Sequence, residues 1–326
     1  MTCGIAPLRW LLAALLCALT AAIAAPLSAQ QYPAKPVKLI VAFPPGAVTD
    51  TTARLIATPL TAALGQPVIV ENRPGASGII GTEAALRAPP DGYTLTIIPS
   101  AYATVPALHK VNFDPIGDIT PIILISWEPF VVVTTPALPV KTIRDLVAHA
   151  KANPGKLNFA SAGPGSPSHF AAELFSARAG IRMHHVPYKG GAPALTDLIA
   201  GQTDVSFIPL PTALPHTRAG KLRAIAVSSR QRSDAAPDVP TVVESGLDYQ
   251  VAFWVGLAGP KGLPRPIVER LNAEVTTAMK SGETGERLRA HGSSLAGGTP
   301  EHFHATIKNE IKLWREVARE AGLQPE

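Results

Sequence analysis

The sequence contains few residues that can support covalent or metal chemistry. It has two cysteines in 326 residues, and both, Cys3 and Cys17, lie in an apolar segment at the N-terminus. Without further cysteines, the rest of the chain has no disulfide, no thiolate nucleophile and no sulfur ligand for zinc. Charged residues make up only 16% of the chain and prolines number 33, a composition that argues against a helical bundle or a coiled coil.

Long hydrophobic runs are also missing beyond this N-terminal segment. The apolar run at 10–23 follows Arg9, is shorter than the roughly 20 residues that span a bilayer, and leads to small residues that suit cleavage near Ala29. We therefore expect a signal peptide at residues 1–29 and a soluble, secreted protein after its removal. Loss of Arg9 lowers the formal net charge from +5 to +4. No run of basic residues accompanies this charge, so we expect no nucleic-acid binding.

The sequence is instead built from alternating strand-like and helical segments. The expected strands are 37–43, 67–71, 94–99, 157–162, 183–188, 205–209 and 222–228. The expected helices are 50–64, 78–87, 142–153, 166–179, 192–200 and a long final helix that begins with the capping sequence 299–301. This alternation predicts an α/β fold with a parallel sheet covered by helices.

Two extended segments, 122–135 and 249–260, connect two series of such elements. If each crosses between two lobes, domain 1 comprises residues 30–130 plus 252–326 and domain 2 comprises residues 131–251. A chain that crosses twice forms a hinge, and a hinge creates a cleft that can close on a ligand.

Four loops at the carboxyl ends of the expected strands form the predicted binding site, because ligands bind at this edge of open α/β sheets. They span 44–50, 100–104, 161–169 and 189–192. Several lead into helices, whose first N–H groups and positive dipole end can hold an anion. The candidate ligand-binding residues are Gly46, Ala47, Val48, Thr49, Asp50, Ser100, Ala101, Tyr102, Ser161, Gly163, Gly165, Ser166, His169, Gly190, Gly191 and Asp204.

In the first loop, PPGAVTD, Gly46 lets the backbone approach a ligand, and the next three amides are candidate donors. We expect Thr49 or Asp50 to cap the following helix. An ordinary turn between a strand and a helix is the alternative interpretation. In the last loop, YKGGAPA, Lys189 either adds charge to the site or is a solvated lysine. Asp204 is expected to anchor this last loop by accepting backbone hydrogen bonds.

The loop SAGPGSPSH offers the hydroxyls of Ser161 and Ser166 and the amides of Gly163 and Gly165 as donors. We interpret His169 as a structural or ligand-orienting group. A Ser166–His169 catalytic pair is the alternative, although the sequence lacks the G-x-S-x-G motif.

Other patterns are weak. The glycines at 75, 78 and 81 do not match a nucleotide-binding fingerprint, and the paired histidines at 184–185 and 302–304 lack further ligands. We therefore expect no cofactor and no metal. Trp127, Phe130 and Trp254 either line the cleft or pack in the core.

The segments YPAKPVKLIVAFPPG, HVPYKGGAPALTDLIAGQTD, GKLRAIAVSS and FWVGLAGP carry a family resemblance. From about Tyr32 to Leu323, the chain resembles the extracytoplasmic solute-binding subunits of the tripartite tricarboxylate transporter family. The resemblance implies a periplasmic, two-domain binding-protein fold of the type II-like kind, with two crossing strands as the hinge. It also implies a carboxylated ligand in the cleft, held mainly by backbone amides and ordered waters.

The resemblance further implies two partners, a large and a small membrane permease subunit, and we expect the binding protein itself to be a monomer. The first loop of this family usually has two adjacent glycines, whereas this chain has Ala47 at the second position. Two other functions stay open: a carboxylate sensor for a signalling partner, and a secreted hydrolase that uses Ser166 and His169.

Overall fold

The predicted strands join into a single mixed sheet. The computed structural model describes residues 32–280 and 282–324, and within them ten strands follow the order β2-β1-β3-β9-β4-β7-β5-β6, with β8 and β10 also paired to β4. The predicted signal peptide and both cysteines lie outside the described residues.

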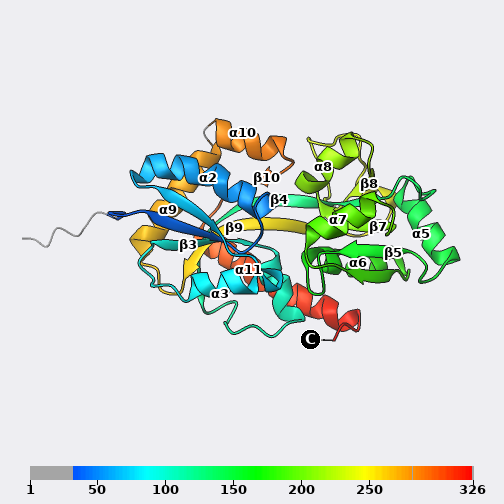
Figure 1. Cartoon of the computed structure of the whole chain (residues 1–326), viewed down its shortest axis with the longest axis horizontal. Coiled ribbons are helices and arrows are strands. Elements are labelled where there is room, and N and C mark those ends of the chain that lie inside the picture. Colours follow the sequence, from blue (N-terminus) through cyan, green and yellow to red (C-terminus); the bar gives the residue numbers. More distant parts are fainter. Residues whose placement is uncertain (1–31, 281, 325–326) are drawn as a thin grey trace, which may run out of the picture. The chain divides into compact units, whose positions relative to one another are not determined.

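Strands and helices alternate in the order that the sequence predicts (Figure 1). The strands are β1 (Val37–Val41), β2 (Val68–Asn72), β3 (Thr94–Pro99), β4 (Ile119–Thr134), β5 (Asn158–Ser161), β6 (His184–Pro187), β7 (Val205–Pro209), β8 (Arg223–Val227), β9 (Ala252–Pro260) and β10 (Ser294–Leu295). The α-helices are α2 (Val48–Leu64), α3 (Ile79–Leu86), α4 (Ala101–Thr104), α5 (Ile143–Ala152), α6 (Pro167–Ala179), α7 (Gly191–Ile199), α8 (Leu210–Arg218), α9 (Arg265–Lys280), α10 (Glu283–Ala290) and α11 (Pro300–Glu320). Short 3-10 helices are η1 (Ala76–Gly78), η2 (Val105–Ala107) and η3 (Val243–Ser245).

Strand β4 belongs to both halves of the sheet. Its residues 119–129 pair with β9, and its residues 130–134 pair with β7 and β8. We call β1, β2, β3, β9, β10 and residues 119–129 half-sheet A, and β5 to β8 with residues 130–134 half-sheet B. Parallel pairs within each half, β1 with β2 and β3, and β5 with β6 and β7, confirm the predicted α/β architecture with a crossing strand.

Local sequence chemistry sets several helix ends. Thr142 and Asp145 form a capping box at the start of α5, and Thr299 caps α11 by accepting a hydrogen bond from the third residue of the helix. Gly65 and Gly180 end α2 and α6 in the left-handed conformation that glycine adopts without a steric penalty. These ends agree with the sequence-based bounds to within about two residues.

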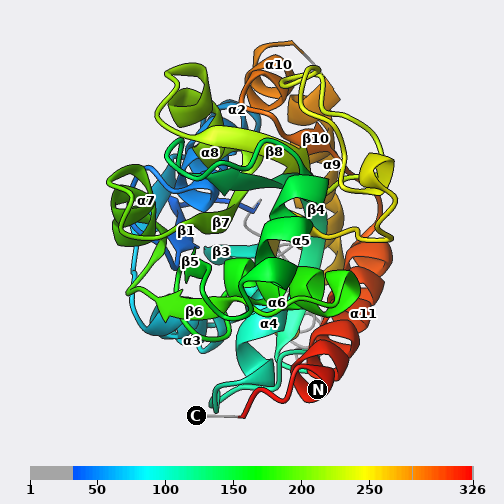
Figure 2. The ribbon, with the colours of Figure 1, turned by 90° about the vertical axis from the view of Figure 1, so that its right-hand side faces the viewer.

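The apolar residues divide into three buried clusters. One lies between half-sheet A and helices α2 and α9, and another between half-sheet B and helices α7 and α8. The third contains residues of both halves together with α5, α6 and α11, and includes the stripe on α11 that the sequence predicts. Figure 2 shows α11 on the side of the sheet away from α7.

The chain returns from half-sheet B to half-sheet A just before β9. The Tyr249 hydroxyl donates a hydrogen bond to the carbonyl of Ala171 in α6, and Ala252 already pairs with Pro129 of β4. The described residues from Lys35 onward pack as one compact unit. The division into two domains at residues 130 and 252 therefore stays a prediction.

Candidate functional site

The carboxyl ends of the parallel strands in both halves meet at one short stretch of β4. Pro99 at the end of β3 pairs with Val255, which pairs with Ser126 of β4. Pro209 at the end of β7 pairs with Phe130 of β4. Along an extended strand, Ser126 and Phe130 are about 13 Å apart. The strand directions make the two carboxyl edges face each other, so the predicted loops gather on both sides of this stretch.

The loop after β1 leads into α2 with free helical amides. Gly46 has a φ of 82°, which favours glycine, and its N–H donates to the Asp50 carboxylate at 2.9 Å. Ala47 is the N-cap and makes no side-chain capping bond, so the prediction that Thr49 or Asp50 caps the helix is wrong. The amides of Val48, Thr49 and Asp50 form the first turn, where the helix itself supplies no acceptor.

Asp50 braces this loop from within. Its side chain is 3% exposed and accepts hydrogen bonds from Gly46, from Arg54 at 3.0 Å and from the Asn72 amide at 2.9 Å. Burial raises the pKa of Asp50, but these hydrogen bonds outweigh it and hold the pKa below its ordinary value. Asp50 is therefore an ionised carboxylate whose charge is neutralised by Arg54, and its side chain fixes the loop rather than facing an anion.

The loop after β2 brings a second helix start next to the end of β1. Its residues 75–78 all have positive φ, including the non-glycine residues Ala76 and Ser77. A Cβ at Gly78 would lie 2.9 Å from the Phe43 ring, and one at Gly81 would lie 2.7 Å from the Ala42 Cα. The absence of side chains at these glycines lets the start of α3 pack directly against the loop that precedes α2.

Ser100 is a buried hydroxyl at the end of β3. Its side chain is 1% exposed, and its Oγ has no hydrogen-bond partner among the described residues. Its own N–H donates to the Trp254 carbonyl, which fixes it at the crossing strands. Ala101 is buried beside it, and the Tyr102 hydroxyl donates to the Pro115 carbonyl at 2.9 Å within the core. Of Ser100, Ala101 and Tyr102, Ser100 is the residue with a polar side-chain atom that has no hydrogen-bond partner among the described residues.

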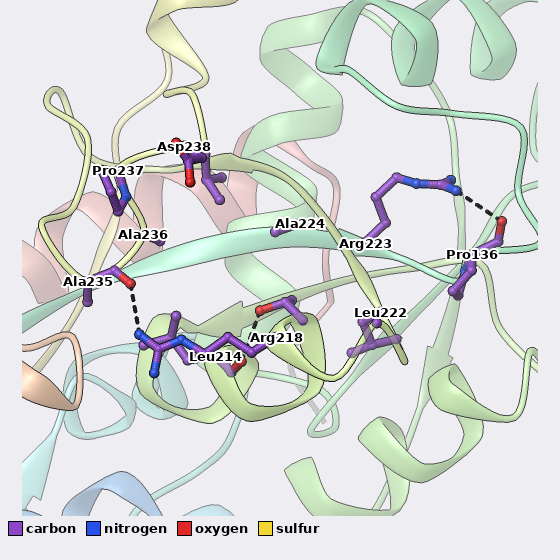
Figure 3. A pocket seen from close by; sticks show the side chains of 13 residues that line it. Pro136, Leu214, Arg218, Leu222, Arg223, Ala224, Ala235, Ala236, Pro237 and Asp238 are labelled. Atoms are coloured by element: carbon purple, nitrogen blue, oxygen red, sulfur yellow. Dashed lines mark hydrogen bonds between the residues drawn. The ribbon is translucent and has the colours of Figure 1, made fainter.

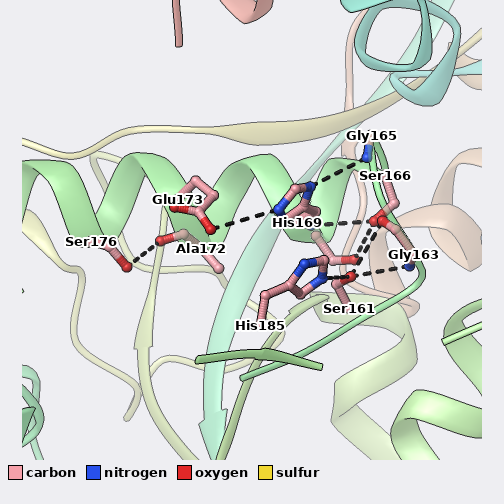
Figure 4. Close-up of polar contacts among 10 residues, drawn as sticks. Ser161, Gly163, Gly165, Ser166, His169, Ala172, Glu173, Ser176 and His185 are labelled. Atoms are coloured by element: carbon pink, nitrogen blue, oxygen red, sulfur yellow. Dashed lines mark hydrogen bonds and ion pairs between the residues drawn. The ribbon is translucent and has the colours of Figure 1, made fainter. Parts of the chain in front are cut away.

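The loop after β5 satisfies its own donors. The Gly163 N–H donates to Ser161 Oγ at 3.1 Å, and the Gly165 N–H donates to His169 Nδ1 at 3.3 Å (Figure 4). Ser166 caps α6 by accepting a hydrogen bond from the His169 N–H. The structure thus brings these five predicted residues together, but in this arrangement the two glycine amides are used inside the loop.

His185 completes this cluster, although the sequence analysis did not assign it to the site. Its ring stacks on His169 with centroids 4.0 Å apart, and its Nε2 lies 2.6 Å from Ser161 Oγ. Burial lowers the pKa of His185 to about 3, with smaller contributions from His169 and His184, so the ring is neutral. The pairing of β5 with β6 places His185 beside Ser161 and His169, and only the register of these two strands indicates that His185 belongs to the site.

The two strand edges also contact each other directly. His109, which follows η2 in half-sheet A, lies with its Nε2 2.9 Å from the Pro164 carbonyl in the loop after β5. Because a carbonyl only accepts, Nε2 carries the proton. A Cβ at Gly165 would lie 2.9 Å from the same imidazole. The loops of the two halves are therefore in contact at this point.

The loop after β6 presents another uncapped helix start. The Gly190 N–H donates to the Ala162 carbonyl, and Gly190 is the N-cap of α7 without a side-chain capping bond. Gly191 and Ala192 follow as exposed residues of the first turn, and Lys189 is exposed before them. Amides of α7 are thus accessible beside the loop after β5.

Asp204 lies at the other end of half-sheet B. Its carboxylate accepts a hydrogen bond from the Asn158 N–H at 2.7 Å, and its carbonyl accepts one from Thr135. Because β5 and β7 are parallel, the start of β7 lies beside the start of β5 and away from Ser161. The prediction that Asp204 anchors the loop after β6 is therefore wrong: Asp204 anchors the start of β5.

Two of the three candidate aromatic residues belong to the core. Phe130 and Trp254 are essentially buried, and Trp254 packs edge-on against Phe303. Trp127, one step along β4 from the buried Ser126, is partly exposed. Only Trp127 is therefore available as a wall of the site.

An open cavity lies elsewhere. It has a volume of about 620 Å³ and lies between α8, the start of β8 and residues 235–239 (Figure 3). Its two arginines are occupied by carbonyls, Arg218 by Ala235 and Arg223 by Pro136, Leu138 and Val140. Since the start of β8 pairs with the end of β4, this cavity lies away from the meeting strand edges, and its cations are not free to bind an anion.

Two features are absent from residues 32–280 and 282–324. No group of three or more histidine, cysteine, aspartate or glutamate side chains in this part of the chain is arranged to hold a metal. No helix in it has the length and apolar character needed to cross a membrane.

Comparison with known proteins decides the family. The model of the tripartite tricarboxylate transporter family receptor matches residues 52–323. The chain belongs to this family. It is 39% identical over 307 residues to Protein BugT of Bordetella pertussis, covering 93% of this chain and 94% of BugT.

Solved structures agree with this assignment. The Rpa4515 protein of Rhodopseudomonas palustris, solved with adipate, is 35% identical with a TM-score of 0.85, and the match covers 90% of this chain and all of that one. MatC from the same organism, with bound malate, is 33% identical with a TM-score of 0.81, covering 88% and 99%. Other similar structures are a periplasmic transporter and the periplasmic binding protein BugD, so the predicted binding-protein fold is confirmed.

As a member of this receptor family, the protein is not an enzyme. The geometry around Ser166 is consistent with this. Ser166 Oγ lies 3.1 Å from Ser168 Oγ and accepts from the His169 backbone, while the His169 ring bonds to Gly165 and faces Glu173 at 3.6 Å. The Ser166 hydroxyl is therefore not hydrogen-bonded to a general base.

Ala47 fits the receptor loop without backbone strain. Its φ of −66° and ψ of 160° are ordinary extended values, whereas only the preceding Gly46 has a positive φ. The methyl group at this position therefore changes the surface of the loop but not its backbone path.

Proposed function

We propose that this protein captures a small carboxylated organic anion between the carboxyl edges of half-sheets A and B. The loops after β1, β3, β5 and β6 surround the ligand, and the two halves close on it by bending near Ser126 to Phe130. Residues 30–130 plus 252–326 move as one body and residues 131–251 as the other.

The observation that carries the proposal is the buried, unpartnered Ser100 hydroxyl. Ser100 directly follows β3 and has no hydrogen-bond partner for its hydroxyl among the described residues. Strand β3 is the sheet neighbour of β1, and β1 leads to the uncapped amides of Val48 and Thr49. A buried hydroxyl without a partner costs about 1–3 kcal/mol, which a bound acceptor would offset. A carboxylate is such an acceptor, and it suits the positive end of α2.

The strength of such a site is sufficient for a transport receptor. Hydrogen bonds to a charged group contribute roughly 1.5–3 kcal/mol each. Ser100, two amides of α2 and one amide of α7 would sum to about 6–12 kcal/mol before entropy losses, and micromolar binding needs about 8 kcal/mol. Two related structures were solved with adipate and malate, which are both dicarboxylates, and this supports a ligand of the same class.

Family membership supports the rest of the proposal. The protein is secreted to the periplasm by its signal peptide, acts as a monomer, and delivers its ligand to a large and a small membrane permease subunit. Uptake of labelled ligand by vesicles that contain both subunits, with and without the receptor, tests the delivery step.

Binding is tested with a change that removes one amide proton. Val48→Pro deletes a first-turn N–H at a helix position that tolerates proline, and the extended ψ of Ala47 suits a following proline. Val48→Ala is the matched control because it keeps the N–H. After removal of co-purified ligand, calorimetry with adipate, malate, citrate and aromatic acids should give a Kd about 10–150-fold weaker for Val48→Pro than for Val48→Ala.

Ser100→Ala should weaken the binding of the same ligands by a similar factor while leaving the protein folded. Small-angle scattering should show a smaller radius of gyration with ligand. If no carboxylate binds to the ligand-free protein, or if both Val48 variants bind equally, the assignment of this site fails.

A further inference from the structure

Helix α11 presents a basic stripe to solvent. Lys308, Lys312, Arg315 and Arg319 are spaced by four, three and four residues, so they lie on one face, and all four are exposed. The opposite face is the buried stripe of Phe303, Ile307, Ile311, Trp314 and Val317. This anchoring holds the basic stripe in a fixed position.

Among the residues that the structure describes, none of the four cations of this stripe lies within 4.0 Å of a carboxylate. Many exposed arginines elsewhere do have such partners. These are Arg54, Arg73, Arg87, Arg232, Arg265 and Arg287. Like charges three or four residues apart destabilise a helix. The dipole at the helix end accounts for Arg319 but not for Lys308 and Lys312, which lie one and a half turns or more before it.

The stripe borders a groove of about 290 Å³. Its lining consists of the partly exposed Ile116, the four cations and Glu316, together with the buried Ile311. Ile116 belongs to the turn before β4, which also carries Asp114; backbone hydrogen bonds lower the pKa of Asp114, and Lys261 and Arg315 add smaller Coulomb effects. We call this surface the α11 groove. Its concave shape with an apolar floor suits a side chain of a protein better than the flat surface of a lipid bilayer.

The helix also contacts both halves of the sheet. It packs against α4 and η2 on the side of half-sheet A and against α6 on the side of half-sheet B, where Trp314 and Phe170 have ring centroids 5.4 Å apart. Figure 2 shows α11 on the opposite side of the view from α7, which borders the candidate ligand site. A partner at the α11 groove would therefore leave the ligand loops accessible.

We propose that the α11 groove is a docking surface for an acidic segment of a partner protein, in which an apolar side chain is flanked by carboxylates. The apolar side chain rests on Ile116, and the carboxylates pair with Lys308, Lys312, Arg315 and Arg319. The charge of the stripe and its lack of internal partners determine the acidic chemistry of the occupant. This docking does not depend on which ligand the strand edges bind.

The test uses the mature protein and a fluorescein-labelled 15-residue peptide in which leucines alternate with aspartates and glutamates. Fluorescence anisotropy should show binding that weakens at least tenfold between 20 and 200 mM NaCl. Lys308→Glu with Lys312→Glu should weaken binding at least tenfold. The matched control, Lys156→Glu with Lys221→Glu, makes the same charge change at exposed sites of half-sheet B and should change binding less than twofold.

Ile116→Ala should weaken binding about threefold to tenfold without a change of net charge, and circular dichroism confirms that each variant is folded. Equal losses in the groove and control pairs would show that only net charge matters and would overturn the proposal. The proposal is also overturned if the peptide does not bind, or if vesicles with 30% phosphatidylglycerol bind the groove in preference to the peptide.

Discussion

Replacing Glu128 by glutamine should raise the free energy of unfolding relative to the wild type by an amount that grows between about pH 4.5 and pH 7. Glu128 lies on the stretch of β4 between the two halves and is 0% exposed. Its Oε1 accepts hydrogen bonds from Ser126 at 2.7 Å and Ser293 at 2.9 Å, while its Oε2 has no partner among the described residues. Burial raises its pKa from 4.5 to about 7, although the two serines act in the opposite direction.

The sign and size of the effect follow from this shift. Below pH 4.5 the carboxyl group of Glu128 is protonated in both the folded and the unfolded chain. Between 4.5 and about 7 it ionises only in the unfolded chain, so the contribution of Glu128 to the free energy of unfolding falls as the pH rises and becomes level above the folded pKa. His185 contributes with the opposite sign below pH 6.5, so the effect of Glu128 is read from the difference between the variant and the wild type. The difference between the ordinary pKa of 4.5 and the folded pKa of about 7 corresponds to about 3 kcal/mol of stability, at 1.36 kcal/mol per pKa unit.

Urea unfolding at intervals from pH 4.5 to 8, followed by tryptophan fluorescence and circular dichroism, measures this dependence. Glu128→Gln should be more stable than the wild type above pH 7, and the difference between the two in the free energy of unfolding should shrink as the pH falls to 4.5. Glu286→Gln, at an exposed position of α10, is the control and should keep the wild-type profile. If Glu128→Gln has the same slope as the wild type, Glu128 does not titrate as argued.

Two further substitutions test the buried network and the packing of α11. Asp50→Asn leaves Arg54 without its ion pair. The free energy of unfolding, measured with urea at pH 7, should therefore be about 1–3 kcal/mol lower than in the wild type. Because the pKa of Asp50 is lowered, this difference should shrink as the pH falls through the folded pKa; a constant difference would contradict the assignment. Gly256→Ala places a Cβ 2.1 Å from the Phe303 ring and should destabilise the protein by about 3 kcal/mol in the same assay. Gly191→Ala meets no atom within 4 Å and should change stability by less than about 0.5 kcal/mol; equal effects of the two glycine variants would refute the packing argument.

The sequence predicts those parts of the fold that depend on local chemistry. Helices α5, α6 and α11 start at the expected residues because Thr142, Ser166 and Thr299 accept hydrogen bonds from the first turn that follows each of them. Helix α8 was not predicted, since Pro211 and Pro215 make residues 210–218 resemble a loop, yet both prolines are accommodated in the structure.

The candidate site is less predictable because it depends on pairing between distant segments. The sequence indicates which loops follow strands, and these loops do gather at two facing edges. It does not indicate that the Gly165 amide is used by His169, since that requires the folded path of the loop. His185 joins the cluster only through the register of β5 with β6, and Asp204 was misplaced because the direction of β7 decides which edge it occupies.

The continuity of β4 limits the ways in which the two halves can move. Hydrogen bonds to β9 on one part and to β7 and β8 on the other prevent either half from sliding along the strand without breaking its ladder. The register shift between Leu124 and Ser126 places a bulge beside the stretch where the strand edges meet, which interrupts the ladder there. If the two halves close as proposed, the continuous strand restricts them to bending about this stretch; ligands of different size would then change the extent of bending, and strain in the bent sheet would favour reopening.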